Sequence, residues 1–387
     1  MVLFVFKDLL SEISSVFSYI DETPLLILAL EMFVKIFRTK KIEIKKTDRY
    51  YFAAILLFII SGIIGNVVYN YQSIDLVVID LIANVKFFFA LAYFERLAKK
   101  YIEGPNCIPR LARILSAILF GLFLLDRLIN IFPAEYRYGI KSNRLYFGHP
   151  TYLAGICVFL IALMTIYNIE KNILYIGMNL IMLVFTLRSK AIVGAVVFIL
   201  LYVVIIKLHA KLKSWHFIVV ALIGVACAWS QIYFYFIYLG GQSARSVMLF
   251  TSFLILKDYF PIGTGFGTFA SHSAAVNYSP VYIKYGFNYI YELRNSADGT
   301  FFDDQFWPIV FGQTGFIGSI CYIYIVFFLF RRIQKMFRMN LKAYTAGLFV
   351  FTYLMISSIA EPAFNNSVSI PLAMVLGICY SKAEHGR

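Results

Sequence analysis

Long apolar runs recur along the whole sequence and restrict the fold more than any other feature. A helix needs about 20 predominantly apolar residues to cross a hydrocarbon layer of roughly 30 Å. Only helices and closed barrels satisfy their backbone polar groups in lipid, and continuous runs favour helices. Such runs lie at 24–38, 51–69, 76–97, 112–131, 149–167, 172–187, 191–207, 216–236, 305–330, 343–360 and 366–381. We therefore predict an all-α polytopic membrane protein with about 11–12 transmembrane helices.

The composition agrees, since 61% of the residues are hydrophobic and 14% are charged. A water-soluble globule cannot cover its surface with so few charges. No Pro-rich linker or repeat divides the chain, so we expect one membrane domain over residues 1–387. The first 20 residues lack the basic start of a signal peptide. They form either a poor first span, which we favour, or an interfacial amphipathic helix.

The basic residues fall into four clusters on one side of the membrane if the spans alternate. The clusters are Arg38 to Arg49, Lys99 to Arg113, Lys207 to Lys213, and Arg331 to Lys342. The positive-inside rule makes this side cytoplasmic, so the net charge of +14 reflects topology and no nucleic-acid partner is expected. The segments predicted outside are 70–75, 131–148, 188–190, 237–304 and 361–365. The longest, 237–304, is expected to be an extracytoplasmic loop subdomain.

Outside segments are normally poor in Arg and Lys, yet several of these carry cations. Their cations are Arg137, Lys141, Arg144, Arg188, Lys190 and Arg245. Each one alone is explained as well by headgroup contact or snorkelling. As a set they favour an anionic ligand at the outer interface, because guanidinium groups bind phosphate bidentately and stay charged.

The long loop contains two further patterns. An apolar stripe at helical spacing, from Val247 to Leu256, predicts a helix along the membrane surface. Pro261 ends it, and Gly263, Gly265 and Gly267 then form a turn whose backbone amides either approach a ligand or serve only the turn.

Acidic and polar residues close the loop at Asp298, Asp303, Asp304 and Gln305. Asp303 and Asp304 either cap the following helix or supply one general base. His149 and His272 have no partners at metal-ligand spacing, so no metal site is expected. Within the spans, Asp80 and Lys86 could serve an ion or proton pathway.

Three stretches of the sequence resemble the O-antigen ligase and polymerase superfamily of membrane glycosyltransferases. The long outside loop precedes the last three spans, as in that family. Arg245 to Leu249 resembles its Arg-x-x-x-Leu element, and the proline–glycine turn of Pro261 to Phe269 follows. In DQFWPIVFGQTGFIG, Asp304, Gln305 and Gln313 stand at the family's His, Asn and Glu. GHPTYLAG at 148–155 and TLRSKAIVG at 186–194 also look familiar.

The resemblance implies a GT-C-like transferase, without metal or other cofactor, whose donor is a polyprenyl-pyrophosphate-linked glycan. Carried over by position, Arg188 and Arg245 would hold the pyrophosphate and Asp304 would be catalytic. The substrate-binding residues would be Arg137, Arg144, His149, Lys190, Gly265 and Gln305. The implied location is the bacterial cytoplasmic membrane, with the active site extracytoplasmic, and the implied partners are the lipid bilayer, a chain-length regulator and a flippase.

The family's ligases carry His where this chain has Asp304, which favours a surface-polysaccharide polymerase over a ligase. Five loop tyrosines, Tyr278, Tyr282, Tyr285, Tyr289 and Tyr291, either stack on sugars or anchor the interface. A lipid-linked oligosaccharide flippase is the alternative from another class.

Overall fold

The computed structural model describes residues 1–39, 48–101, 107–133, 135–137, 139–210, 212, 214–294 and 301–385. Lys40, Lys41, Lys45, Lys46, Lys211, Lys213 and Asp298, which the sequence analysis singled out, lie outside the described residues. The first part of the chain contains α1 (Val2–Val5), α2 (Lys7–Ile13), η1 (Ser15–Asp21), α3 (Thr23–Thr39), α4 (Arg49–Tyr69), α5 (Ile74–Tyr101), α6 (Cys107–Ile129), β1 (Glu135–Arg137) and β2 (Ile140–Ser142). The middle contains α7 (Pro150–Asn168), α8 (Ile173–Phe185), α9 (Ser189–Leu201), η3 (Tyr202–Lys207), α10 (Ser214–Ile232) and η4 (Tyr233–Tyr238). The remainder contains η5 (Gly240–Gln242), α11 (Ala244–Asp258), α12 (His272–Val276), α13 (Pro280–Lys284), η6 (Phe287–Tyr289), α14 (Trp307–Met336), α15 (Leu341–Ser357) and α16 (Ser369–His385).

The protein is all-α apart from the β1–β2 hairpin, and each apolar run predicted to span lies on a helix. In the described part of the chain, five helices are long and apolar enough to cross a membrane. They are Arg49–Tyr69, Cys107–Ile129, Pro150–Asn168, Ser189–Lys207 and Trp307–Met336. This is the helix content of a polytopic membrane protein.

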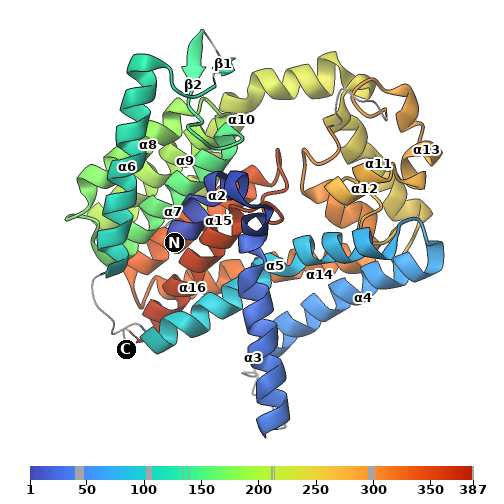
Figure 1. Ribbon diagram of the computed structural model, residues 1–387, viewed down its shortest axis with the longest axis horizontal. Coiled ribbons are helices and arrows are strands. Elements are labelled where there is room, and N and C mark those ends of the chain that lie inside the picture. The colour runs from blue at the N-terminus through green and yellow to red at the C-terminus, as the bar shows by residue number, and fades with distance from the viewer. Residues whose placement is uncertain are drawn as a thin grey trace.

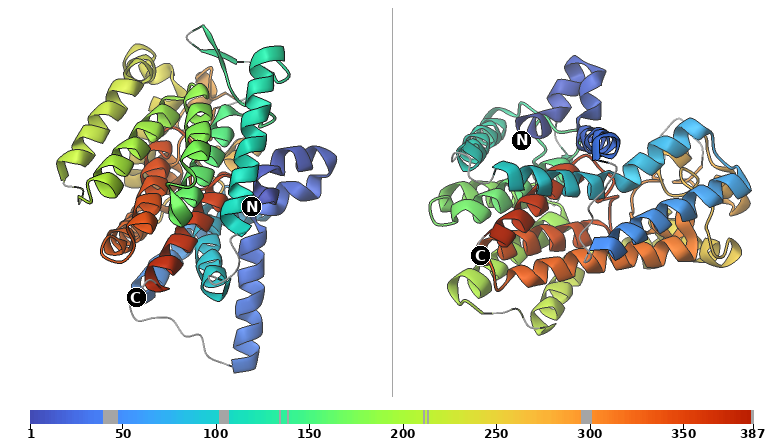
Figure 2. Two further views of the ribbon diagram at one scale, coloured as in Figure 1. Left: turned by 90° about the vertical axis from the view of Figure 1, so that its left-hand side faces the viewer. Right: turned by 90° about the horizontal axis from the view of Figure 1, so that it is seen from below.

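Helix α7 lies at the centre, because its most apolar window is 89% buried, whereas that of α6 is 28% buried. A helix that is apolar all round belongs in a core, and α7 packs against α8, α15 and α16. The long helices α4 and α14 run side by side across Figure 1, at a steep angle to α6 (Figures 1 and 2).

Our expectation of a first span in Met1–Ile20 is wrong. This segment forms α1, α2 and η1, none longer than seven residues, and Ser14 between α2 and η1 is extended. Seven residues of helix cover far less than a hydrocarbon layer. Asp21 instead pairs with Lys7 and with Lys86 of α5, and Ile13 and Val16 are 79% and 72% exposed. These features fit the alternative, an interfacial amphipathic segment.

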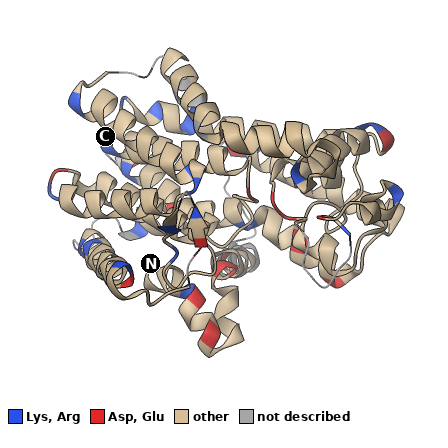
Figure 3. Ribbon diagram, turned by 90° about the horizontal axis from the view of Figure 1, so that it is seen from above, with Lys and Arg blue, Asp and Glu red and all other residues tan. Residues whose placement is uncertain are grey.

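Several of the segments predicted outside contact one another, and we call the region of these contacts the loop end. Residues 70–75 bond to the 237–304 loop through Gln72 Nε2 and the carbonyls of Gly267 and Ser273, at 3.0 and 3.1 Å. The 131–148 loop joins the α8–α9 connection, where Asn143 N donates to Phe185 O at 2.8 Å. Figure 3 shows that charged residues gather at helix ends and on loops.

Residues predicted inside meet at a second place, which we call the basic end. Arg332 Nη1 and Nη2 donate to the two carboxylate oxygens of Glu95, both at 3.0 Å. Lys99 Nζ lies 2.9 Å from Glu384 Oε2. These pairs join α5, α14 and the end of α16.

A backbone crossing fixes the loop against the helices, and it predicts a stability effect. Gly315 in α14 has φ 60° and ψ −158°, and a Cβ there would overlap the backbone of Gly263. We expect Gly315→Ala to lower the free energy of unfolding by about 1–3 kcal/mol, because only glycine adopts this backbone conformation readily. Thermal unfolding in detergent measures it. Gly121→Ala, on α6 with nothing within 4 Å of its Cβ, is the control and should change stability by no more than about 1 kcal/mol. Equal effects of the two substitutions would contradict the crossing.

Candidate functional site

Arg188 is held between the α8–α9 connection and the β hairpin. It is the N-cap residue of α9, and its Nη2 donates to Glu135 Oε2 at 2.6 Å. The Arg188 side chain is 13% exposed, and its Nε has no hydrogen-bond partner in the described structure. Burial lowers the pKa of Arg188, and the positive charge of Arg137 lowers it further. A buried cation with an unused donor is a place where an anion gains binding energy.

Lys190 lies two residues further on and pairs with a residue that the sequence analysis did not select. Its Nζ is 2.6 Å from Glu361 Oε2, and the side chains are 10% and 13% exposed. Burial raises the pKa of the Glu361 carboxyl, an effect that the charge of Lys190 opposes. This pair ties α9 to the α15–α16 connection.

Arg245 and Asp304 bring the two ends of the long loop together. Arg245 Nε and Nη2 each lie 3.2 Å from Asp304 Oδ2, and the guanidinium stacks over Tyr235 with Cζ 4.5 Å from the ring centre. Asp304 does not cap α14, whose N-cap residue is Phe306 and has no side-chain bond, so our capping alternative is wrong. Burial raises the pKa of Asp304, and the charge of Arg245 opposes this rise.

Arg137 and His149 surround Arg188 on the side of the hairpin. Arg137 lies opposite Ile140 in the β1–β2 pair. Burial lowers the pKa of His149 to about 4, with the charge of Arg188 as the next cause, so this imidazole is neutral near pH 7. His149 Nδ1 accepts a bond from Thr151 N at 3.3 Å, and therefore caps α7.

The other two cations of the 131–148 loop have local partners. Arg144 Nη1 donates to Gly148 O at 3.1 Å, while Arg144 Nε is buried with no partner in the described structure. Lys141 is buried and bonds to Asp126 Oδ1 at 2.8 Å. Lys141 therefore stabilises the loop, whereas Arg144 retains a free donor.

Arg137, Arg144, Arg188, Lys190 and Arg245 together form what we call the cation cluster. Arg137, Arg188 and Arg245 are connected electrostatically, since the charges of Arg137 and Arg245 both contribute to the lowered pKa of Arg188. Lys190 follows Arg188 at the start of α9, and Arg144 lies in the same predicted outside loop as Arg137. Three of the five cations pair with acids, which are Glu135, Glu361 and Asp304, whereas Arg137 and Arg144 make no ion pair in the described structure. Cations without an acidic partner can attract anions.

Gly265 and its turn are fixed by the helices. Gly265 N donates to Gln313 O at 2.9 Å, and a Cβ on Gly265 would overlap Asn66 of α4. Gly267 N donates to Asp80 Oδ2 at 2.9 Å. The turn therefore has a structural role, and a contact from Gly265 to substrate stays a prediction.

Asp80 and Lys86 make different contacts, and a role of either in an ion or proton pathway stays a prediction. Asp80 holds Gly267 of the glycine turn, whereas Lys86 pairs with Asp21 of the N-terminal segment. Gln305 is buried and its Nε2 lies 3.5 Å from Ile359 O, which connects the start of α14 to the end of α15.

Four of the five loop tyrosines divide into two groups, and the fifth, Tyr285, donates its hydroxyl to Asp258 Oδ2 at 2.7 Å. Tyr282 is fully buried, and its hydroxyl accepts from Ala270 N at 2.9 Å. Tyr278 donates to Leu293 O at 3.1 Å and packs against the same core. Sugar stacking by Tyr282 is therefore excluded, while Tyr289 and Tyr291 are exposed on the loop surface.

Comparison with known proteins gives no further constraint, because no known family matches the sequence and no curated protein is significantly similar to it. Function has to be argued from the site alone.

Glu135 and Glu361 are the main functional candidates that sequence reasoning missed. Each is a single acid in a segment predicted outside, and each pairs with a cation of another segment. The sequence did contain a signal for these two acids. Cations at the membrane interface need counter-ions, and the neighbouring outside segments contain few acids that could supply them. The sequence could not say which acid meets which cation.

Proposed function

We propose that this protein is a surface-polysaccharide polymerase of the bacterial cytoplasmic membrane. It transfers a polyprenyl-pyrophosphate-linked glycan onto a lipid-linked repeat unit, at the extracytoplasmic face and without a metal ion. The observation that carries the proposal is the cation cluster at the loop end, with arginines that make no ion pair in the described structure and arginine donors without a hydrogen-bond partner there. A pyrophosphate diester, charged on each phosphate, matches both features.

Donor binding proceeds by ion exchange, because Arg188 and Arg245 are each paired with an acid. Glu135 and Asp304 are 41% and 35% exposed, so both ion pairs can open. Glu361 is only 13% exposed and stays on Lys190. The pyrophosphate then takes the places of Glu135 and Asp304 on the two arginines.

The same exchange frees the base. Asp304 loses its ion pair when Arg245 turns to the donor, which raises the pKa of Asp304 further and strengthens it as a proton acceptor. The acceptor hydroxyl gives its proton to Asp304, and its oxygen attacks the anomeric carbon of the donor glycan. The bond from that carbon to the pyrophosphate oxygen breaks, and polyprenyl pyrophosphate leaves with its charge stabilised by the arginines.

Reconstitution into vesicles distinguishes this proposal from its alternatives. The substrate is a labelled polyprenyl-pyrophosphate repeat unit, and both glycan length and movement of the label across the bilayer are measured. Long glycans on the lipid support a polymerase. Transfer only to a different acceptor indicates a ligase, and label that crosses the bilayer without glycan growth indicates a flippase.

Ion exchange predicts an unusual gain of affinity. Glu135→Gln should lower the donor Kd by about 1.5- to 5-fold, because a partly exposed ion pair that competes with the ligand is worth roughly 0.2–1 kcal/mol. Binding of polyprenyl pyrophosphate in detergent measures this change. Glu361→Gln is the contrasting variant, since it removes the partner of buried Lys190 and should not tighten binding. Weaker binding by Glu135→Gln would contradict the exchange.

A further inference from the structure

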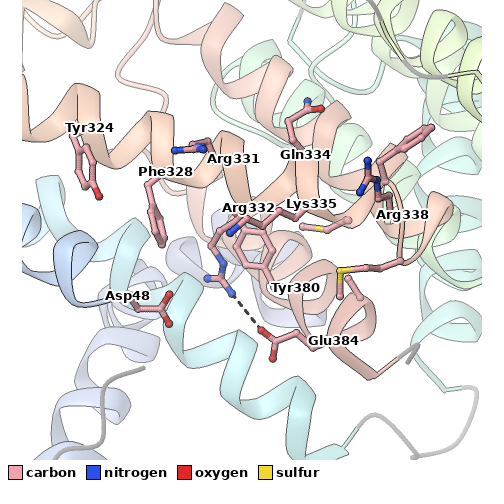
Figure 4. Close-up of a pocket in the computed structure, with 14 residues that line it drawn as sticks. Asp48, Tyr324, Phe328, Arg331, Arg332, Gln334, Lys335, Arg338, Tyr380 and Glu384 are labelled. Carbon is pink, nitrogen blue, oxygen red and sulfur yellow. Dashed lines mark ion pairs between the residues drawn. The ribbon is translucent and has the colours of Figure 1, made fainter. Parts of the chain in front are cut away.

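A cavity of about 1150 Å³ lies at the basic end, away from the cation cluster. It is bounded by the C-terminal part of α14, the end of α16 and Asp48 before α4 (Figure 4). Nothing in the proposed transfer reaction uses it. The cavity at the loop end that lies next to Glu361 is only about 10 Å³, room for a single water molecule.

Three lining cations have no acid within ion-pair distance in the described structure. Arg331, Lys335 and Arg338 are exposed, and their spacing of four and three residues places them on one side of the chain at the end of α14. Arg331 has only an aromatic contact, with Cζ 5.6 Å from the centre of the Phe327 ring.

A fourth cation, Arg332, lines one side of the cavity and is held in place by its neighbours. Arg332 donates to both oxygens of Glu95 and stacks on Tyr380, with Cζ 3.9 Å from the ring centre. Its charge is already balanced, so it holds the wall in place and leaves Arg331, Lys335 and Arg338 to meet a ligand.

The same helix face continues into apolar surroundings. Tyr324 and Phe328 precede Arg331 at the same helical spacing and line the cavity. Aromatic rings deeper along the helix, followed by cations at its end, match an amphiphile with an acyl chain and an anionic head. Inorganic phosphate would use the cations but leave the aromatic part unfilled.

We propose that this cavity binds the phosphate headgroup of an anionic phospholipid, with its chain against Tyr324 and Phe328. The site is independent of the reaction at the loop end. The positive-inside rule alone places cations on this side of the membrane but predicts neither a cavity nor selective lipid binding, and the proposed site has both.

Native mass spectrometry of the full-length protein in a neutral detergent tests the proposal, with phosphatidylglycerol and phosphatidylcholine titrated in parallel. The wild type should prefer phosphatidylglycerol. The variant R331Q/K335Q/R338Q should bind it about tenfold to a hundredfold more weakly. The matched control R110Q/K171Q/K207Q removes three exposed cations from the same side but outside the cavity, and should bind as the wild type does.

Charge and folding are separated by two further variants. R331K/R338K keeps all charges and should retain lipid binding. K335Q alone changes one exposed residue and should weaken lipid binding, so it provides the test if the triple variant fails to fold. Equal loss in the control variant, or equal binding of the two lipids, would overturn the site. Displacement of the lipid by millimolar inorganic phosphate would show a free-anion site and overturn the lipid assignment.

Discussion

Arg245→Ala and Arg188→Ala are each expected to reduce glycan chain extension by about 10²–10³-fold, without lowering the amount of protein in the membrane. In the proposed reaction both guanidinium groups stabilise the pyrophosphate as it leaves, and their ion pairs with partly exposed acids contribute little to stability. The loss should appear mainly in the rate of extension at saturating donor, because the charge on the leaving oxygen grows in the transition state. Polymer length on gels and protein abundance on blots measure the two quantities.

Two control variants accompany these substitutions: one replaces Arg245 by lysine, and the other removes a different arginine of the same loop. Arg245→Lys keeps the charge but loses the paired donors, so it should retain only part of the activity. Arg294→Ala removes an exposed arginine of the same loop, whose side chain contacts the Tyr291 ring with Cζ 4.7 Å from the ring centre, and this variant should extend glycans normally. Wild-type polymer from either alanine variant at 188 or 245 would remove that residue from the site.

Asp304→Asn should lower the transfer rate by about 10²–10⁴-fold, the range that a general base contributes. The substitution keeps the size of the side chain and can still accept a bond from Arg245, so the structure should persist. In the proposed reaction the carboxylate form of Asp304 is active, and burial is the main cause that raises its pKa. The rate should therefore fall as the pH is lowered, with a midpoint above that of an ordinary aspartate.

Asp303→Asn is the matched control, because Asp303 is the exposed neighbour and its charge raises the pKa of Asp304. Removing that charge should lower the pKa of Asp304 and move the acid limb of the pH–rate profile to lower pH, with the maximum rate retained. If Asp304→Asn kept the wild-type rate and pH profile, Asp304 would serve only to position Arg245.

The helices could be predicted from sequence because the bilayer imposes a single requirement on each apolar run. Every predicted span lies on a helix for this reason. The N-terminal segment has no such signal, since its helices are short and gain their stability from contacts. Its Asp21 pairs with Lys86, which is 65 residues away in sequence. Pattern reading cannot reach such contacts.

The site was predicted as a list of cations but not as an arrangement. Arg188, Lys190 and Arg245 stood out because basic residues are rare outside. Their acidic partners could not be assigned, because Glu135 lies 53 residues from Arg188 and Asp304 lies 59 from Arg245. Asp304 looked like a helix cap only because the sequence could not show that α14 starts at Trp307.

Photo-crosslinking of the donor tests the central claim most directly. The wild-type protein in vesicles receives polyprenyl pyrophosphate with a photoreactive group next to the pyrophosphate, and labelled peptides are mapped by mass spectrometry. We predict labels on residues 186–190 and 243–249, and loss of both when unlabelled polyprenyl pyrophosphate competes. Labels confined to residues 324–338, or equal labelling by a polyprenyl alcohol probe that lacks the pyrophosphate, would contradict the account.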